Sequence, residues 1–194
     1  MKISEITRET KETNIQCTLN LNGTGKTEIY TGIGFFDHML DGFARHGLFD
    51  LKLKSVGDLE VDSHHTAEDT GIVLGTAIKE AVEDKAGLKR FGHFTLPMDE
   101  TLVLCALDLS GRPYLGFDAK FTVESLGGLE TELINEFFYA LSYSAMMNIH
   151  LKVLEGQNNH HMAEGLFKAF GRALDMATTI DERVSGAWTT KGSL

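Results

Sequence analysis

Two short segments of the chain combine a pair of adjacent histidines with a glutamate three residues after the second histidine. They are DSHHTAED (62–69) and NNHHMAEG (158–165), and the second copy follows the first by 96 residues. The chain has only 8 histidines, so half of them lie in these two motifs. The repeated side chains are His64, His65 and Glu68 in the first motif, and His160, His161 and Glu164 in the second.

At the start of a helix, this HHxxE spacing favours metal binding. Residues four apart share a helix face and residues three apart lie close to it, so Glu68 can approach either His64 or His65. Adjacent imidazoles diverge by about 100° around the helix axis. One motif can therefore supply one imidazole to each of two metal ions. Imidazole and carboxylate ligands suit Mn, Fe, Ni or Zn.

A solvated surface pair is the simpler interpretation of a single HHxxE segment, but two copies at equivalent places favour metal binding. His38, in FFDHML, adds an imidazole in the helical segment before the first motif. Taken alone, that histidine would indicate a structural role. His46, His93 and His150 lack a partner pattern, and we expect structural roles for them.

Composition excludes several other classes of protein. The 194 residues, 42% of them hydrophobic, are sufficient for a sizeable core. The formal net charge of -10 argues against nucleic acid as a partner over a broad cationic surface. Cys17 and Cys105 lie far apart and predict no disulfide framework. No apolar signal segment or membrane-length apolar run occurs, so we expect a cytoplasmic protein with no membrane partner.

The remaining sequence predicts the elements that position the motifs. Alternation in residues 13–21, followed by NGTG and KTEIY, predicts a β-hairpin. GTGKT within it resembles the end of a phosphate-binding loop, but that loop needs a glycine where the chain has Asn20, so we favour a turn. Apolar spacing then predicts a helix, a strand and an HHxxE helix, and the same order recurs in the second half.

LKLK (51–54) and LKVL (151–154) occupy matching places before the two motifs, which indicates an internal duplication. We therefore predict an α+β fold made of a duplicated unit, with each half a sheet that has helices packed on one face. The chain would be a single domain, residues 1–194, built from two repeats of roughly 1–90 and 91–194.

Longer motifs carry a family resemblance. GFFDHML, DSHHTAEDTGI, RFGHFTLPMDET, DLSGRPY, NNHHMAEGLFKAFGRAL and TTKGSL together resemble the monofunctional imidazoleglycerol-phosphate dehydratase family of histidine biosynthesis. The resemblance covers nearly the whole chain. It implies a duplicated α+β fold similar to the second domain of ribosomal protein S5, which agrees with the duplication predicted above.

The resemblance also implies a reaction, which is the loss of water from D-erythro-imidazoleglycerol phosphate to give imidazoleacetol phosphate. The substrate imidazole, bound as an imidazolate between two metal ions, would be the electron sink and pass through a diazafulvene-like intermediate. The implied cofactors are two Mn2+ per active site, with Fe2+ or Co2+ as substitutes. The implied assembly is a homo-oligomer of twenty-four chains with active sites between subunits.

Site residues follow from the resemblance position by position. The implied metal ligands are His38, His64, His65, Glu68, Glu136, His160, His161 and Glu164. Many family members have a histidine at the place of Glu136, so this glutamate either completes the metal shell or lies outside it, with His150 as the alternative ligand. The implied catalytic carboxylates are Glu12, Glu68, Glu164 and, as a lesser candidate, Asp99. The implied substrate contacts are Glu12, Arg90, Arg112, Lys168 and Lys191, the basic residues among them pairing with phosphate.

Two other functions stay open from the residues alone. Another dinuclear metalloenzyme, such as a phosphoesterase, would activate water against the phosphate, although Asp-rich ligation would favour it more than these histidines do. A non-catalytic, metal-assembled shell or storage protein would leave four residues without a shared purpose, namely Glu12, Arg90, Arg112 and Lys191. An RNA-binding role would rest on fold alone, and the acidic charge opposes it.

Overall fold

A computed structural model describes residues 3–191, and within this range the chain forms ten strands and four helices. The first half contains β1 (Ser4–Glu9), β2 (Thr13–Asn20), β3 (Thr27–Tyr30), α1 (Gly34–Gly47), β4 (Asp50–Gly57) and α2 (His64–Val82). The second half contains β5 (Phe91–Met98), β6 (Thr101–Asp108), β7 (Tyr114–Asp118), α3 (Glu132–Ala145), β10 (Asn148–Glu155) and α4 (Asn159–Thr178), with a short hairpin of β8 (Ser125–Leu126) and β9 (Leu129–Glu130) before α3.

Both halves have the same sheet topology. The strand order is β1-β2-β4-β3 in one sheet and β5-β6-β10-β7 in the other. In each sheet, the strand that carries LKLK or LKVL lies between an antiparallel neighbour and a parallel neighbour. The predicted α+β fold with an internally duplicated unit is therefore confirmed.

The hairpin predicted from β2 and β3 is wrong, because β4 lies between these two strands. Leu53 of β4 pairs antiparallel with Cys17 and parallel with Ile29. The NGTG turn folds against the start of β4, where Asp50 Oδ1 accepts hydrogen bonds from the backbone N–H groups of Thr24 and Lys26 at 2.8 and 3.0 Å. A strand follows the turn, so GTGKT does not have the strand, loop and helix context of a phosphate-binding loop.

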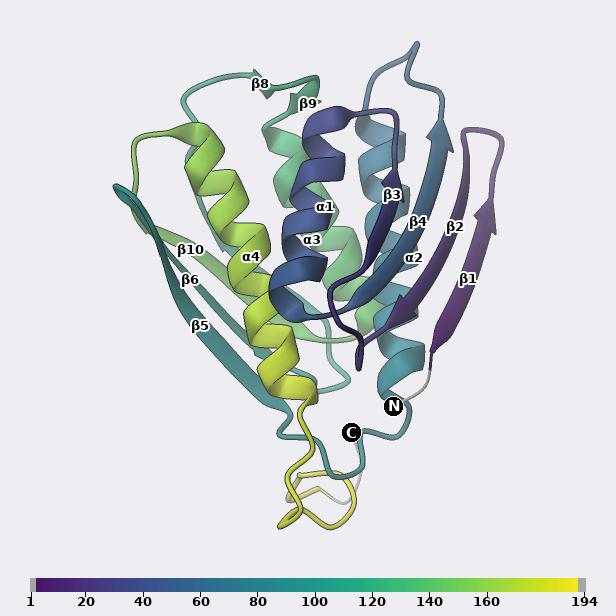
Figure 1. Ribbon diagram of the computed structural model, residues 1–194, viewed down its shortest axis with the longest axis vertical. Helices are drawn as coiled ribbons and strands as arrows, with labels where there is room; N and C mark the ends of the chain where they lie inside the picture. Colours follow the sequence, from purple (N-terminus) through teal and green to yellow (C-terminus); the bar gives the residue numbers. More distant parts are fainter. Residues whose placement is uncertain (1–2, 192–194) are drawn as a thin grey trace.

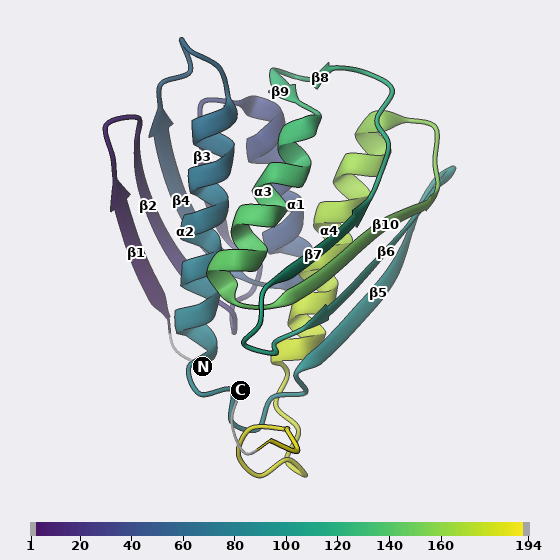
Figure 2. The ribbon, with the colours of Figure 1, turned by 180° about the vertical axis from the view of Figure 1, so that it is seen from behind.

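The four helices lie between the two sheets, as Figures 1 and 2 show from opposite sides. α2 packs on β1 and β2 and, on its other side, on α3 of the second half. α4 packs on β5 and β6 and also on α1 of the first half. Helices therefore cover one face of each sheet, as predicted. Within residues 3–191, no helix combines the length and the apolar character needed to span a membrane.

Buried aromatic rings join the helices at the centre of the molecule. Phe36 of α1 meets Phe137 of α3 with ring centroids 5.3 Å apart, and Phe137 stacks on Phe167 of α4 at the same separation. All three side chains are almost completely buried. Aromatic pairs at this spacing contribute beyond the area they bury, so the core that joins the two repeats is also the core that holds α1, α3 and α4 together.

Glycines set the close approach of the helices that cross between the repeats. Gly75 of α2 and Gly171 of α4 hold the same position in the two repeats, 96 residues apart. A Cβ atom at Gly75 would lie 2.5 Å from the carbonyl oxygen of Leu141 on α3, and a Cβ atom at Gly171 would lie closer still to that of Phe43 on α1. Backbone lies against backbone at both places, so no side chain can move aside.

We expect Gly75→Ala to lower the free energy of unfolding by about 1–3 kcal/mol, because the added methyl group must push α2 away from α3. The matched control is Gly42→Ala in α1, where a Cβ atom would meet Lys168 Cγ at 3.7 Å, an ordinary contact. That change should stabilise by up to about 1 kcal/mol. Denaturation midpoints measure both, and equal effects at the two positions would contradict the packing argument.

Candidate metal and substrate site

The predicted metal ligands lie in the first two turns of the four helices, and these helices begin at the same end of the molecule (Figures 1 and 2). The HHxxE motifs begin α2 and α4. His38 and Glu136 are each the fifth residue of their helices, α1 and α3. Helix N-termini carry partial positive charge, which favours the carboxylates that lie there.

The second motif meets His38 of the other repeat. The ligand atoms of His38, His160 and Glu164 all lie within 4.8 Å of one another, and this is the one such group of three found in residues 3–191. Glu164 Oε2 is 3.6 Å from His38 Nε2 and 3.1 Å from His160 Nε2. The packing of α1 on α4 brings these groups together although they lie far apart in the sequence.

Burial and a neighbouring lysine act in opposite directions on Glu164. Only 6% of this residue is exposed, and burial by itself raises the pKa of its carboxyl group. Lys168 Nζ lies 2.5 Å from Glu164 Oε1, and its hydrogen bond and charge, together with His38 and His160, outweigh the burial, so the pKa lies below its ordinary value. The carboxylate is therefore ionised, which is the form that could bind a metal ion.

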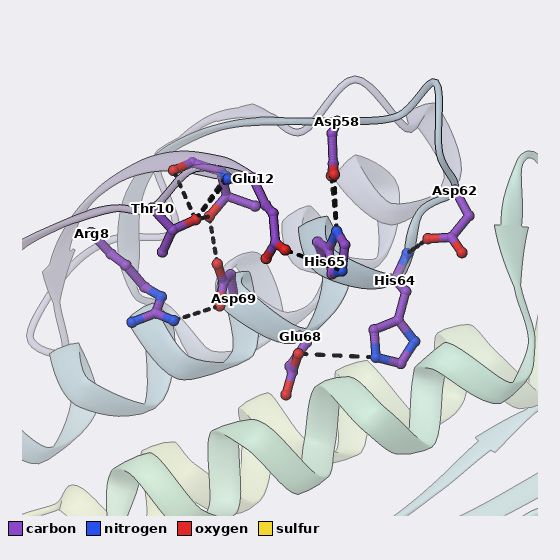
Figure 3. A network of polar contacts seen from close by, with 10 residues as sticks. Arg8, Thr10, Glu12, Asp58, Asp62, His64, His65, Glu68 and Asp69 are labelled. Carbon is purple, nitrogen blue, oxygen red and sulfur yellow. Dashed lines mark hydrogen bonds and ion pairs between the residues drawn. The ribbon is translucent and has the colours of Figure 1, made fainter.

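The first motif lies on α2 beside α3 (Figure 3). His64 Nε2 and Glu68 Oε2 are 3.9 Å apart. This geometry shows that Glu68 approaches His64 and not His65. Glu136 occupies the place on α3 that His38 occupies on α1, but within the described residues no hydrogen bond or ion pair joins it to the first motif. His150 lies on the outer face of the second sheet, where its ring contacts Tyr114.

The two imidazoles of each motif diverge, as the helical spacing predicts. The ring planes of His64 and His65 make an angle of 84°, and those of His160 and His161 an angle of 87°. The first histidine of each pair faces the glutamate four residues later. The second histidine faces a carboxylate from another part of the chain.

Those carboxylates, Asp58 and Glu100, escaped the sequence analysis because neither belongs to a histidine motif. His65 Nδ1 lies 3.0 Å from Asp58 Oδ2, and His161 Nδ1 lies 2.9 Å from Glu100 Oε2. These hydrogen bonds raise the pKa of both imidazoles above its ordinary value, and the bond to His161 helps to hold the pKa of Glu100 far below its usual range. One sequence feature could have indicated Glu100, because KETNI and DETLV share a Glu-Thr pair that places Glu100 at the position of Glu12.

Glu12 lies in the turn between β1 and β2, and its side chain points toward His65 of the first motif (Figure 3). Its Oε1 atom is 3.9 Å from His65 Nε2, and its side chain is exposed. Thr13 anchors this turn by donating a hydrogen bond of 2.5 Å to Asp69, a buried residue that also pairs with Arg8 at 2.9 Å. The anchor fixes the backbone beside Glu12 while its carboxylate stays accessible. Asp99, in the corresponding turn between β5 and β6, is also exposed.

Three of the predicted phosphate contacts lie at the other end of the second sheet. Arg90 Nε and Nη2 pair with Asp108 at 2.7 and 3.1 Å, and Nη1 donates to the carbonyl oxygen of Trp188 at 2.8 Å. This bond brings the C-terminal segment with Lys191 near Arg90, while exposed Arg112 follows the end of β6. The last three residues of the TTKGSL motif lie outside the described residues.

The metal-ligand and phosphate-binding candidates are thus separated within one chain. β6 begins beside Glu100, at the second motif, and ends at Asp108, beside Arg90. Its eight residues span about 23 Å at the usual rise of a strand. Lys168 is the exception among the predicted phosphate contacts, because it lies with Glu164 at the metal end.

Comparison with known proteins identifies the family. A profile of the family described as imidazoleglycerol-phosphate dehydratase matches residues 31–174. The chain is 61% identical over 193 residues to an imidazoleglycerol-phosphate dehydratase of Lachnoclostridium phytofermentans, across 100% of this chain and 98% of that protein. It is 57% identical over 190 residues to that of Acetivibrio thermocellus, across 98% and 97% of the two chains.

A solved structure agrees with this result. The crystal structure of the dehydratase from Staphylococcus aureus superimposes with a TM-score of 0.84 at 38% identity, over 93% of this chain and 100% of that one. The range matched by the family profile, residues 31–174, includes both histidine motifs. The chain therefore belongs to the imidazoleglycerol-phosphate dehydratase family.

Proposed function

We propose that this chain dehydrates imidazoleglycerol phosphate to imidazoleacetol phosphate in histidine biosynthesis. Membership of the family supports the reaction and the small phosphorylated substrate. The observation that carries the proposal is the grouping of His38, His160 and Glu164 at the shared end of the helices. A phosphoesterase or a storage protein is not favoured by relatives that are named dehydratases along their whole length.

The proposed cofactors are two Mn2+ per active site, with Fe2+ or Co2+ as substitutes. Imidazole nitrogens and ionised carboxylates are the ligand types that these ions accept. Glu164 is ionised beside two imidazole Nε2 atoms, so the residues present fit such an ion. When bound, the ions would supply Lewis acidity toward the substrate imidazole. The ligands we propose are His38, His64, His65, Glu68, Glu136, His160, His161 and Glu164.

Glu12 is the residue that we propose for moving the carbon-bound proton. A general base must reach the substrate, and the exposed Glu12 carboxylate lies 3.9 Å from the Nε2 atom of a proposed metal ligand, His65. Within the described residues, no hydrogen-bond donor occupies the Glu12 carboxylate, so its oxygens are available to accept a proton. Asp99 remains a lesser candidate beside the second motif.

Arg90, Arg112 and Lys191 are the proposed phosphate contacts. Asp108 holds the guanidinium of Arg90 in a fixed orientation through two hydrogen bonds, and the Arg112 side chain is exposed. Guanidinium groups match the geometry of phosphate oxygens. Lys168 would contact substrate at the metal end, where it already neutralises Glu164.

The separation of these groups supports an active site shared between subunits. The substrate consists of an imidazole, a three-carbon chain and a phosphate, and it is much shorter than the length of β6 that separates the two sets of residues. One molecule of substrate therefore needs the metal ligands of one copy and the cations of another. We propose a homo-oligomer of twenty-four chains on the family resemblance, and a cytoplasmic location on the biosynthetic reaction.

The direct test is turnover of imidazoleglycerol phosphate by chelator-treated protein before and after addition of Mn2+. We expect imidazoleacetol phosphate only with metal, about two ions bound per chain, and a smaller particle mass after chelation. Metal content and particle mass are measured on the same samples. Uptake of metal and assembly without any dehydration would contradict the proposed function.

Glu12→Gln should lower kcat by at least about 100-fold, because the amide cannot take up the proton. Metal content and particle mass should stay unchanged, because we do not assign Glu12 to the metal shell. The matched control is Glu9→Gln, which changes an exposed glutamate of β1 at the edge of the same sheet. A loss confined to KM, or a similar loss in the control, would exclude proton transfer by Glu12.

Subunit mixing tests the shared site. We expect Glu68→Gln and Arg112→Ala proteins to be nearly inactive alone, the first at the metal end and the second at the phosphate end. Dissociated and reassembled together, they should regain part of the wild-type activity, because some sites then combine an intact metal end with an intact phosphate end. Each variant reassembled alone is the control, and no recovery in mixed particles of full mass would place the whole site within one chain.

A further inference from the structure

We infer that Glu100 is a positioning residue that holds His161 in the tautomer with hydrogen on Nδ1 and so leaves the lone pair of Nε2 free for a metal ion. Asp58 does the same for His65. The inference rests on the proposed metal-dependent function and extends it to two residues outside the histidine motifs. Neither carboxylate is among the proposed ligands or substrate contacts.

The two oxygens of Glu100 have different partners. Oε1 accepts hydrogen bonds from the backbone N–H of Asn158 at 2.9 Å, from that of Gln157 at 3.4 Å, and from the Thr101 hydroxyl at 2.8 Å. Oε2 lies 2.9 Å from His161 Nδ1. Backbone N–H groups can only donate, so Oε1 is committed to the loop before α4 and Oε2 is turned toward the imidazole.

This arrangement determines where the imidazole carries its hydrogen. An ionised carboxylate only accepts, so a neutral His161 must donate from Nδ1 and keep an unprotonated Nε2. A metal-binding histidine commonly donates its other ring nitrogen to a carboxylate in this way, which fixes both tautomer and ring orientation. Asn158 also caps α4, accepting from the backbone N–H of His160 and His161 at 2.9 and 3.3 Å. Glu100 therefore holds both the ring of His161 and the loop that begins its helix.

In the first repeat, the carboxylate that contacts Nδ1 of the second histidine comes from a different position in the sheet. Glu12 and Glu100 correspond in the two repeats, since each lies in the first turn of its sheet and precedes a threonine that starts the next strand. Asp58, directly after β4, contacts His65 Nδ1, and both of its carboxylate oxygens lie within 3.1 Å of that nitrogen. Glu12 Oε1 lies instead 3.9 Å from His65 Nε2. Positioning by Asp58 thus leaves Glu12 available for proton transfer.

Glu100→Gln gives a sharp test, because the amide has one acceptor and one donor. Its oxygen must take the place of Oε1, facing the donors of Asn158, Gln157 and Thr101. Its NH2 group then faces His161 Nδ1 and donates to it, which favours the tautomer with hydrogen on Nε2. We expect the dissociation constant for Mn2+ at the affected site to rise about 10–100-fold, measured by chelator competition. The melting temperature of the metal-free protein should change little, because the loop donors keep their acceptor.

Asp58→Asn is the matched variant. No second donor to the Asp58 carboxylate is present in residues 3–191, so the amide can turn its oxygen toward His65 Nδ1 and preserve the tautomer. We expect a change of only a few-fold in Mn2+ affinity. Glu155→Gln, at the exposed end of β10, removes the same charge as Glu100→Gln without a histidine contact and should leave the affinity unchanged.

Two results would overturn the inference and leave the proposed function intact. The first is unchanged Mn2+ affinity in Glu100→Gln. The second is an equal loss in Glu100→Gln and Asp58→Asn, because charge, and not the direction of a hydrogen bond, would then set the affinity. A wild-type protein that dehydrates its substrate without binding Mn2+, Fe2+ or Co2+ would overturn both the inference and the proposed cofactors.

Discussion

The close packing of helices across the two repeats is the constraint on which the rest of the structure depends. α2 packs on α3 and α4 packs on α1, and backbone meets backbone at Gly75 and Gly171. Each HHxxE motif therefore faces a helix of the other repeat and not of its own. His38 reaches Glu164 only because the helices cross in this way. A repeat that folded alone would bury its sheet against α2 or α4 but could not form this group of candidate ligands.

The first turns of α2 and α4 have similar sequences because the unit is duplicated, but the residues around their glutamates differ. Glu164 is paired with Lys168, whereas the corresponding pair of positions in the first repeat is Glu68 and Ile72, with no cation. The first repeat instead has Asp69, which is buried against Arg8 and Thr13 and replaces Gly165 of the second. In the second motif, Lys168 therefore neutralises Glu164. In the first motif, Asp69 instead anchors the turn between β1 and β2. Two metal positions built on these motifs would differ in charge although the backbone around them repeats.

The sequence predicts what is local and misses what depends on distant partners. Apolar spacing and the histidine motifs predicted the helices, because both features repeat along one element. The NGTG turn predicted a change of direction correctly but not that β4 would lie between the two strands that it joins, because turn chemistry does not choose the neighbours of a strand. The edge strands β1 and β5 were missed, since β1 has little buried apolar surface and β5 contains Pro97, which an edge tolerates. Glu100 was missed because it lies 61 residues from His161.

Under the proposed function, the length of β6 would link assembly to catalysis. The strand begins next to Glu100, which contacts the second motif, and ends at Asp108, which pairs with Arg90. A correctly folded chain therefore holds its candidate metal ligands and candidate phosphate contacts apart. No rearrangement of side chains can close a gap of about 23 Å. Under the proposed function, a second copy would have to present its own cations to these candidate metal ligands. Under the proposed function, contacts between subunits would then be selected for the placement of Arg112 and Lys191 as well as for stability, and an isolated chain would be folded but inactive.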